Sequence, residues 1–351
     1  MRIAIMTIQS VNYGNRLQNY ALQEVLHAQG CQADSLRRHA GFGNSLAGTL
    51  RIAKRTLGSL RNHGRKALFA RFDRRISFSR LTASREYVSP NLTDAYDAFV
   101  MGSDQIWNPD FDFNSDLEYL PFVPSAQKVA YAASFGVSRV TEDRALTASC
   151  LRDIPSISVR EDAGATIVED LTGVRPEVVL DPTMLLSIDE WGTVAKRPEM
   201  PNAGSPFMLK YVLGDDAHEE TMASLARERD LVVVDLKDKS LPVGPAEFVW
   251  LIANASMVCT DSFHASVFSL LFHRPFVIFE RQSSDADMSS RFDTLCRVFR
   301  MESHRYCKDS FDLARCENED WGAFEERLAS ERARSLAWLV SALEKVGDAR
   351  A

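Results

Sequence analysis

The chain contains 351 residues, of which 45% are hydrophobic and 25% are charged, an ordinary balance for a globular protein. A chain of this length exceeds what one hydrophobic core usually serves, so we expect two domains. The formal net charge of −7 argues against general binding to nucleic acid.

The first half of the chain alternates short apolar runs with helical patterns. Residues 2–8 predict a buried strand, and they lack the features of a signal peptide, so we expect a cytoplasmic protein. A polar turn then leads into a helix at 16–29, which Gly30 closes. Further strands are expected at 99–101, 129–132, 157–159 and 178–180.

A strongly basic segment precedes the strand at 99–101. Residues 51–85 contain eleven Arg or Lys and a single acid, Asp73. We interpret this segment as part of a helical insertion at about 45–85. One interpretation is a solvated helical surface, and the other is a surface that contacts an anionic partner, such as the inner face of a membrane or a lipid-linked acceptor.

The second half repeats the alternation after a Pro/Gly-rich stretch at 197–206, the best linker candidate. Two β-α-β series predict two doubly wound, Rossmann-like α/β domains that face a cleft, residues 1–196 and 206–351. We expect the last helix to pack back on the first domain. Strands are expected at 207–212, 231–235, 257–260 and 275–279, and helices at 217–229, 245–254, 263–272 and 325–346.

In doubly wound domains, ligands bind beyond the carboxyl ends of the strands, and four strand ends carry unusual polar residues. Arg160 follows the strand at 157–159, and a guanidinium binds phosphate or carboxylate with two hydrogen bonds. The alternative is a surface ion pair between Arg160 and Glu161 or Asp162.

Two further polar strand ends lie in the first domain. Ser103, Asp104 and Gln105 offer hydrogen bonds, and Trp107 offers a face for stacking on a sugar, although a turn with a buried tryptophan is the competing interpretation. Asp181 follows the strand at 178–180, where it would position a ligand or fix a turn before proline.

The fourth strand end lies in the second domain, where the strand at 257–260 runs directly into a helix. Asp261 or Ser262 is a natural N-cap, and His264 then lies in the first helical turn. The amide donors and the positive end of the helix dipole in that turn suit an anion. The competing interpretation is a histidine with a purely structural role.

No motif of a metal or nucleotide enzyme is present. The sequence contains no GxGxxG, Walker, HExxH or GxSxG motif, and its six cysteines form no CxxC pair. We therefore expect no metal site, and an NAD enzyme or a P-loop enzyme is disfavoured.

Taken together and in order, these motifs resemble the polysaccharide pyruvyltransferase family. The resemblance covers residues 1 to about 300. It rests on Asn12-Tyr-Gly-Asn15, Gly102-Ser-Asp-Gln-Ile-Trp-Asn-Pro109, Tyr131-Ala-Ala-Ser-Phe-Gly136, Ser158-Val-Arg-Glu-Asp162, Leu180-Asp-Pro182, Thr260-Asp-Ser-Phe-His264 and Ser290-Arg-Phe292.

The resemblance implies a GT-B-like fold and transfer of pyruvate from phosphoenolpyruvate to a saccharide as a ketal, with no metal or organic cofactor. It implies that Arg160 and His264 contact the donor, with Phe263 and Asn15 part of the matching motifs. Some branches carry an arginine where this chain has Ser262, and we expect Arg291 to complete the phosphate site.

His264 is then the general acid or only a donor ligand, and Asp104 is a base or a ligand of the acceptor sugar. We expect the acceptor in the first domain and the donor in the second. Two other functions stay open: a GT-B glycosyltransferase that uses a nucleotide sugar, and a non-catalytic protein that binds a saccharide or a lipid carrier.

Overall fold

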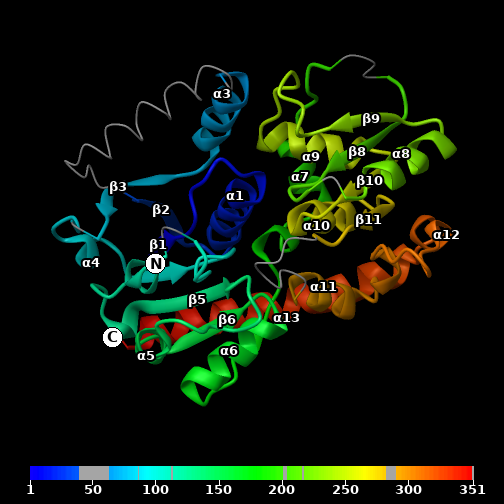
Figure 1. Cartoon of the computed structure of the whole chain (residues 1–351). Helices are drawn as coiled ribbons and strands as arrows, with labels where there is room; N and C mark the ends of the chain where they lie inside the picture. Colours follow the sequence, from blue (N-terminus) through cyan, green and yellow to red (C-terminus); the bar gives the residue numbers. More distant parts are fainter. Residues whose placement is uncertain are drawn as a thin grey trace, which may run out of the picture. The chain divides into compact units, whose positions relative to one another are not determined.

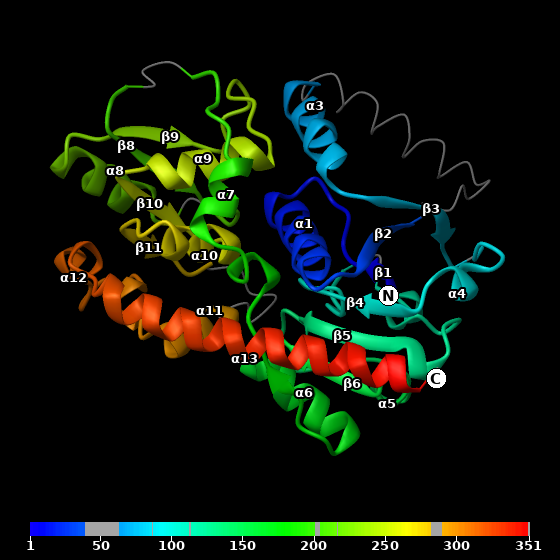
Figure 2. The ribbon, with the colours of Figure 1, turned by 180° about the vertical axis from the view of Figure 1, so that it is seen from behind.

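The chain forms two compact α/β units, each built on a parallel sheet (Figures 1 and 2). The computed structural model describes residues 1–38, 63–85, 87–111, 114–200, 204–215, 217–281 and 290–349. The first unit takes its described residues from Met1–Leu60, Asp73–Leu185 and Ser330–Ala351, and the second from Arg61–Phe72 and Leu186–Ala329. The division therefore lies before the Pro/Gly-rich stretch at 197–206, at the junction of residues 185 and 186.

The sheet of the first unit has seven parallel strands in the order β3-β2-β1-β4-β5-β6-β7. Every residue of β4 and β5 is buried, as are four of the five residues of β1. Burial on both faces explains why these strands appear in the sequence as continuous apolar runs. The strands are β1 (Arg2–Met6), β2 (Gln32–Arg38), β3 (Phe78–Ala83), β4 (Ala98–Met101), β5 (Lys128–Ala133), β6 (Ser156–Val159) and β7 (Glu177–Val178).

Helices cover this sheet, and the carboxyl-terminal part of the last helix is among them. In both views α13 runs along β5 and β6 (Figures 1 and 2). The Tyr131 and Trp338 rings lie 6.1 Å apart, and the Leu180 amide donates to Ser335 Oγ at 3.0 Å. The helices of the first unit are α1 (Tyr13–Ala28), α4 (Leu92–Ala95), α5 (Arg144–Arg152), α6 (Asp162–Thr172) and the end of α13 (Trp321–Asp348).

The second unit has a four-stranded parallel sheet in the order β11-β10-β8-β9. Its core includes edge-to-face contacts of Phe268 with Trp191 and Phe248. The strands are β8 (Phe207–Tyr211), β9 (Val232–Asp235), β10 (Met257–Thr260) and β11 (Phe276–Ile278). The helices are α3 (His63–Phe72), α7 (Ile188–Val194), α8 (Glu219–Glu228), α9 (Pro245–Asn254), α10 (Phe263–Leu271), α11 (Ser290–Phe299), α12 (Leu313–Glu317) and the start of α13.

The expected helical insertion at about 45–85 is wrong in its last part. Residues 78–83 form β3, an edge strand that pairs with β2. Residues 63–72 form α3, which groups with the second unit, and residues 39–62 lie outside the described part of the chain. Within the described part, no helix is both long enough and apolar enough to cross a bilayer.

Candidate functional site

The polar residues predicted for the first unit follow the carboxyl ends of its strands. Strand order reverses direction between β1 and β4, the kind of position at which doubly wound sheets bind ligands. Asn15 lies in the first turn of α1, which follows β1, and Ser103 and Asp104 follow β4. Arg160 follows β6, and Asp181 follows β7. One edge of the sheet therefore carries all five residues.

Arg160 connects the members of this group. Its side chain is 1% exposed and donates to Asp181 at 2.9 Å and to Asp104 at 3.3 Å, while Glu161 lies 3.6 Å from its Nε. Burial by itself lowers the pKa of the Arg160 guanidinium, but the charges of Asp104, Asp181 and Glu161 outweigh burial and raise that pKa above its ordinary value. The arginine is therefore neither exposed nor in a surface ion pair.

Asp181 fixes a turn and holds Arg160 at the same time. Its Oδ1 accepts from the Thr183 amide at 3.0 Å and from the Thr183 hydroxyl at 2.7 Å, which caps the 3-10 turn η4 (Pro182–Met184). Its Oδ2 accepts from Arg160 at 2.9 Å and from the Ser103 hydroxyl at 3.0 Å. Asp181 thus fixes the turn before Thr183 and orients Arg160, and a role in positioning a ligand stays a prediction.

Asp104 has the more exposed carboxylate of the two that Arg160 bridges. Its side chain is 8% exposed, against 0% for Asp181. Its Oδ1 also accepts from the Gln105 amide at 2.9 Å, and the Asn15 side chain donates to its Oδ2. The backbone of Asp104 is left-handed, with φ of 66°, which aspartate tolerates better than most residues.

We call Arg160, Asp104, Asp181 and Glu161 the Arg160 cluster. It contains one guanidinium and three carboxyl groups, so the carboxyl groups outnumber the cation. The Asp181 and Glu161 side chains are 0% exposed, so Asp104 is the carboxylate of this cluster that a hydroxyl donor such as that of a sugar would reach.

Trp107 and Gln105 lie close to the Arg160 cluster in the chain, and both are buried. Trp107 is 1% exposed, and its ring stacks on Tyr119 at 5.3 Å with an interplanar angle of 11°. Phe135 also lies 5.3 Å from the Trp107 ring. This packing favours the buried-turn interpretation of Trp107 over a sugar-stacking face.

In the second unit, strand order reverses between β8 and β10, and Asp261 lies at that point. Its two carboxylate oxygens accept from the amides of Leu213 and Gly214, each at 2.7 Å. Asp261 is 3% exposed and therefore ties the end of β10 to the loop after β8. This geometry gives Asp261 a positioning role.

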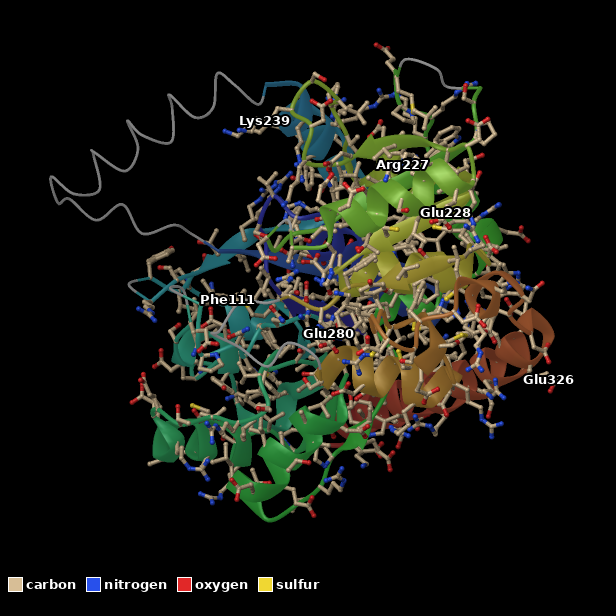
Figure 3. All side chains as sticks on the ribbon, turned by 45° about the vertical axis from the view of Figure 1, so that its right-hand side comes forward. Phe111, Arg227, Glu228, Lys239, Glu280 and Glu326 are labelled. Atoms are coloured by element: carbon tan, nitrogen blue, oxygen red, sulfur yellow. The ribbon has the colours of Figure 1, made fainter. Side chains whose placement is uncertain are left out.

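Arg281 is a residue of this site that the sequence interpretation missed. It follows β11, and its Nε donates to Asp261 Oδ2 at 2.7 Å while its side chain keeps 22% exposure. The preceding residue, Glu280, is labelled in Figure 3 and pairs with Arg305. The same signal that selected Arg160, a cation just after a buried strand, would have selected Arg281.

Helix α10 begins two residues after Asp261 in the chain. Ser262 is its N-cap, and no side-chain hydrogen bond caps the helix, so the serine hydroxyl does not compete for the first-turn amides. His264 lies in the first turn and is 6% exposed. The Phe263 ring lies edge-on to the His264 ring, with 5.4 Å between centroids.

Arg291 lies in the first turn of α11 and is 7% exposed. The neighbouring Phe292 ring lies 6.5 Å from the Phe263 ring, which packs the start of α11 against the start of α10. The second unit thus carries His264 and two arginines at or near the carboxyl edge of its sheet. Among the described residues, no group of three or more His, Cys, Asp or Glu could hold a metal ion.

Solved structures with this fold include two sugar-nucleotide epimerases. UDP-GlcNAc 2-epimerase from Neisseria meningitidis, bound to UDP-GlcNAc, matches with a TM-score of 0.50 and 10% identity over 98% of this chain and 100% of that chain. A putative UDP-N-acetylglucosamine 2-epimerase from Listeria monocytogenes matches with a TM-score of 0.50 and 9% identity over 98% and 95%. At such identities the likeness shows the fold alone, which is GT-B-like.

Comparison with curated protein sequences finds no match. The model of one protein family, described as polysaccharide pyruvyl transferase, matches residues 12–283. That span is well over half of the chain, and it contains both the Arg160 cluster and the first turn of α10. The chain belongs to the polysaccharide pyruvyl transferase family.

Proposed function

We propose that this protein transfers the pyruvyl unit of phosphoenolpyruvate to a saccharide, forming a pyruvate ketal during surface or exopolysaccharide synthesis in the cytoplasm. The observation that carries the proposal is the family match over residues 12–283. The side chains at the strand ends of both units support it, because the reaction needs cations for a polyanionic donor and acceptors for sugar hydroxyls.

The reaction can be written without a metal or an organic cofactor. C3 of phosphoenolpyruvate gains a proton, and C2 becomes electrophilic and forms a bond to a sugar hydroxyl oxygen. The C2–O bond to phosphate breaks, and phosphate leaves with the bonding electron pair. A second sugar hydroxyl then adds to C2 and closes the ketal, and the protons of both hydroxyls are released.

We assign donor binding mainly to the second unit. The first turn of α10 presents amides to an anion, and Arg281 and Arg291 supply cations near that turn in the fold. Arg281 replaces the arginine that related branches carry at the position of Ser262. His264 is the proposed acid that protonates C3, and the tie from Asp261 keeps Arg281 in place.

We assign acceptor binding to the Arg160 cluster. The contact of Arg160 with Asp181 is shorter than its contact with Asp104, 2.9 Å against 3.3 Å. Asp181 therefore holds the guanidinium, and Asp104, the more exposed of the two carboxylates, is the one that a sugar hydroxyl would contact. Asp104 would then accept the proton of the attacking sugar hydroxyl.

The test follows ketal formation and phosphate release from phosphoenolpyruvate, with a panel of saccharides as acceptors. His264→Gln should lower kcat by about 100-fold or more, because it removes a general acid. The matched control is His273→Gln in the same unit, whose ring nitrogen pairs with Glu325 at 2.7 Å and which should turn over like the wild type. Unchanged turnover in His264→Gln would remove His264 from the mechanism. Product formation from a nucleotide sugar alone would instead assign a glycosyltransferase.

A further inference from the structure

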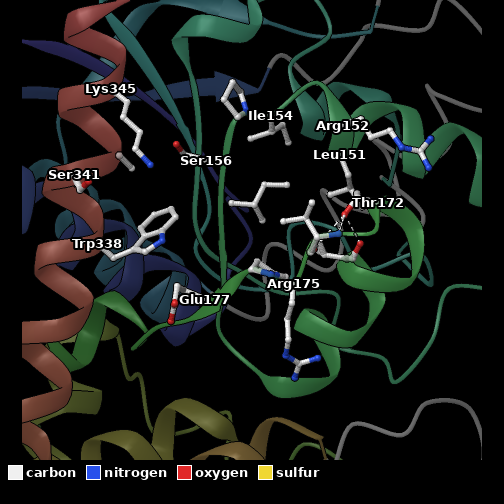
Figure 4. A pocket seen from close by; sticks show the side chains of 16 residues that line it. Leu151, Arg152, Ile154, Ser156, Thr172, Arg175, Glu177, Trp338, Ser341 and Lys345 are labelled. Atoms are coloured by element: carbon white, nitrogen blue, oxygen red, sulfur yellow. Dashed lines mark hydrogen bonds between the residues drawn. The ribbon is translucent and has the colours of Figure 1, made fainter.

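The first unit contains a pocket that the proposed reaction does not use. It has a volume of about 460 Å³ and lies between α5, α6 and the carboxyl-terminal part of α13 (Figure 4). Ser156 and Ile157, at the amino end of β6, form part of its wall, whereas Arg160 follows the opposite end of that strand. The pocket is therefore separate from the Arg160 cluster.

The lining of this pocket is mixed, with apolar side chains contributed by α5, α6 and α13. Its apolar lining includes Leu151 of α5, Val168 of α6 and Ile154, which lies between α5 and β6. Helix α13 adds Trp338 and Ala342. Residues spaced three and four apart on a helix share a face, so α13 presents one continuous side to the cavity. In Figure 4, Trp338 and Lys345 extend from α13 toward the pocket.

The charges around the pocket do not cancel. Two lining residues are neutralised locally, because Arg175 pairs with Glu169 at 2.7 Å and Glu177 pairs with Arg334 at 3.3 Å. The other two charged lining residues are Arg152, on the wall opposite α13, and Lys345.

Neither of these two cations makes an ion pair with a described residue. Arg152 donates only to the carbonyl of Leu171, at 2.6 Å. Lys345 extends toward the pocket, whereas the Arg152 guanidinium lies on the side far from α13 (Figure 4). An anionic group is the complement of the Lys345 ammonium.

We propose that this pocket binds a single-chain amphiphile with an anionic head, a phosphate or a carboxylate. Its volume falls in the range of about 300–1,000 Å³ that is usual for small-molecule sites. The chain contacts Trp338 and the aliphatic wall, and the head contacts Lys345. The uncharged polar side chains of the lining are Ser156, Thr172 and Ser341, too few to read the edge of a base or a sugar.

Calorimetric titration with monomeric alkyl phosphates, kept below their micelle concentrations, tests this proposal. Octyl, nonyl and decyl phosphate should bind with affinities that rise by about fourfold per methylene, equivalent to about 0.8 kcal/mol. Lys345→Glu should weaken decyl phosphate by about tenfold or more, because a charge-assisted contact is lost. Decanol, which lacks the charge, should bind more weakly than decyl phosphate.

A steric variant keeps the test independent of charge. Ser341→Trp places a large side chain at an exposed lining position and should abolish binding, whereas Ala333→Trp, exposed on the same helix outside the lining, should bind normally. Equal binding by these two variants, or no saturable binding by the wild type, would overturn the proposal. Binding only to vesicles of phosphatidylcholine and phosphatidylserine, unaffected by Ser341→Trp, would assign the interaction to a surface and also overturn it.

Discussion

Arg160 occupies a buried position between carboxylates that come from different strand ends. Removing the guanidinium would leave Asp104, Asp181 and Glu161 without the charge that faces them, so this residue affects folding as well as ligand binding. A loss of activity on substitution of Arg160 is therefore informative only beside a measure of stability.

Arg160→Ala should lower the free energy of unfolding by about 3–5 kcal/mol, because it breaks a buried ion-pair network by removing one partner. Arg144→Ala is the matched control in the same unit, since the Arg144–Asp170 pair is largely exposed and should contribute about 1 kcal/mol or less. Urea unfolding followed by circular dichroism measures both. Equal stability of the two variants would contradict the buried network.

Cys307 should react with iodoacetamide faster than the buried cysteines do. A hydrogen bond from Ser310 lowers the pKa of the exposed Cys307 thiol, whereas burial raises the pKa of Cys259, Cys296 and Cys316 to about 12. The thiolate is the nucleophile, so the alkylation rate of Cys307 should rise with pH over a lower range than that of an ordinary thiol. Peptide mass spectrometry gives the rates, and Ser310→Ala should move the Cys307 profile to higher pH. An unchanged profile would exclude the hydrogen bond as the cause.

At the scale of elements, Gly102 and Gly192 differ in whether their positions can accept a side chain. Gly102 follows β4 with φ of +118°, and an added Cβ would lie 2.3 Å from the Tyr131 carbonyl oxygen. Gly192 lies within α7, and an added Cβ would meet nothing within 4 Å. The first glycine is required by backbone conformation and space, whereas the second is not.

Gly102→Ala should lower the free energy of unfolding by about 3 kcal/mol or more, since both the positive φ and the backbone contact oppose a side chain. Gly192→Ala should raise it by about 0.5–1 kcal/mol, because alanine loses less backbone entropy in a helix. Chemical denaturation of the two variants beside the wild type gives both values. A destabilised Gly192→Ala, or a Gly102→Ala as stable as the wild type, would show that this local geometry is wrong.

The sequence predicted every described strand except β2 and β3, and the difference has a physical reason. The predicted runs at 2–8, 99–101 and 257–260 correspond to strands buried on both faces, whose apolar residues are continuous. In contrast, β2 and β3 carry arginines and serines among their apolar residues, which a helical or irregular segment would equally show. Helix α9 was predicted with its observed bounds because its apolar residues are dense and a proline marks its start.

The sequence predicted where the residues of the candidate site lie better than it predicted their contacts. Sequence order alone placed Arg160, Asp104 and Asp181 at strand ends, and parallel topology brings such ends to one edge. Sequence order did not predict which side chains form ion pairs, because the Arg160–Asp181 pair joins residues that are 21 positions apart in the chain. Arg281 was missed although it too follows a buried strand, and it is tied to Asp261 as directly as Arg160 is to Asp181.

At the scale of the whole molecule, family membership and fold agree on an enzyme with two α/β units, and the second unit carries the proposed donor site. Its cations and helix start are complementary to a polyanion, and the Arg160 cluster is complementary to hydroxyl groups. The proposed function therefore requires that the protein bind phosphoenolpyruvate. This binding can be measured without knowing the acceptor.

The most direct measurement is calorimetric titration of the purified protein with phosphoenolpyruvate, beside His264→Gln and Arg281→Gln. The control is Arg227→Gln, a surface residue of the same unit that pairs with Glu220 and is labelled in Figure 3. We predict saturable binding by the wild type and the control, and binding weaker by about tenfold or more in the other two variants, because each loses a charge-assisted contact. Failure of the wild type to bind phosphoenolpyruvate, with tight binding of a nucleoside diphosphate in its place, would contradict the account.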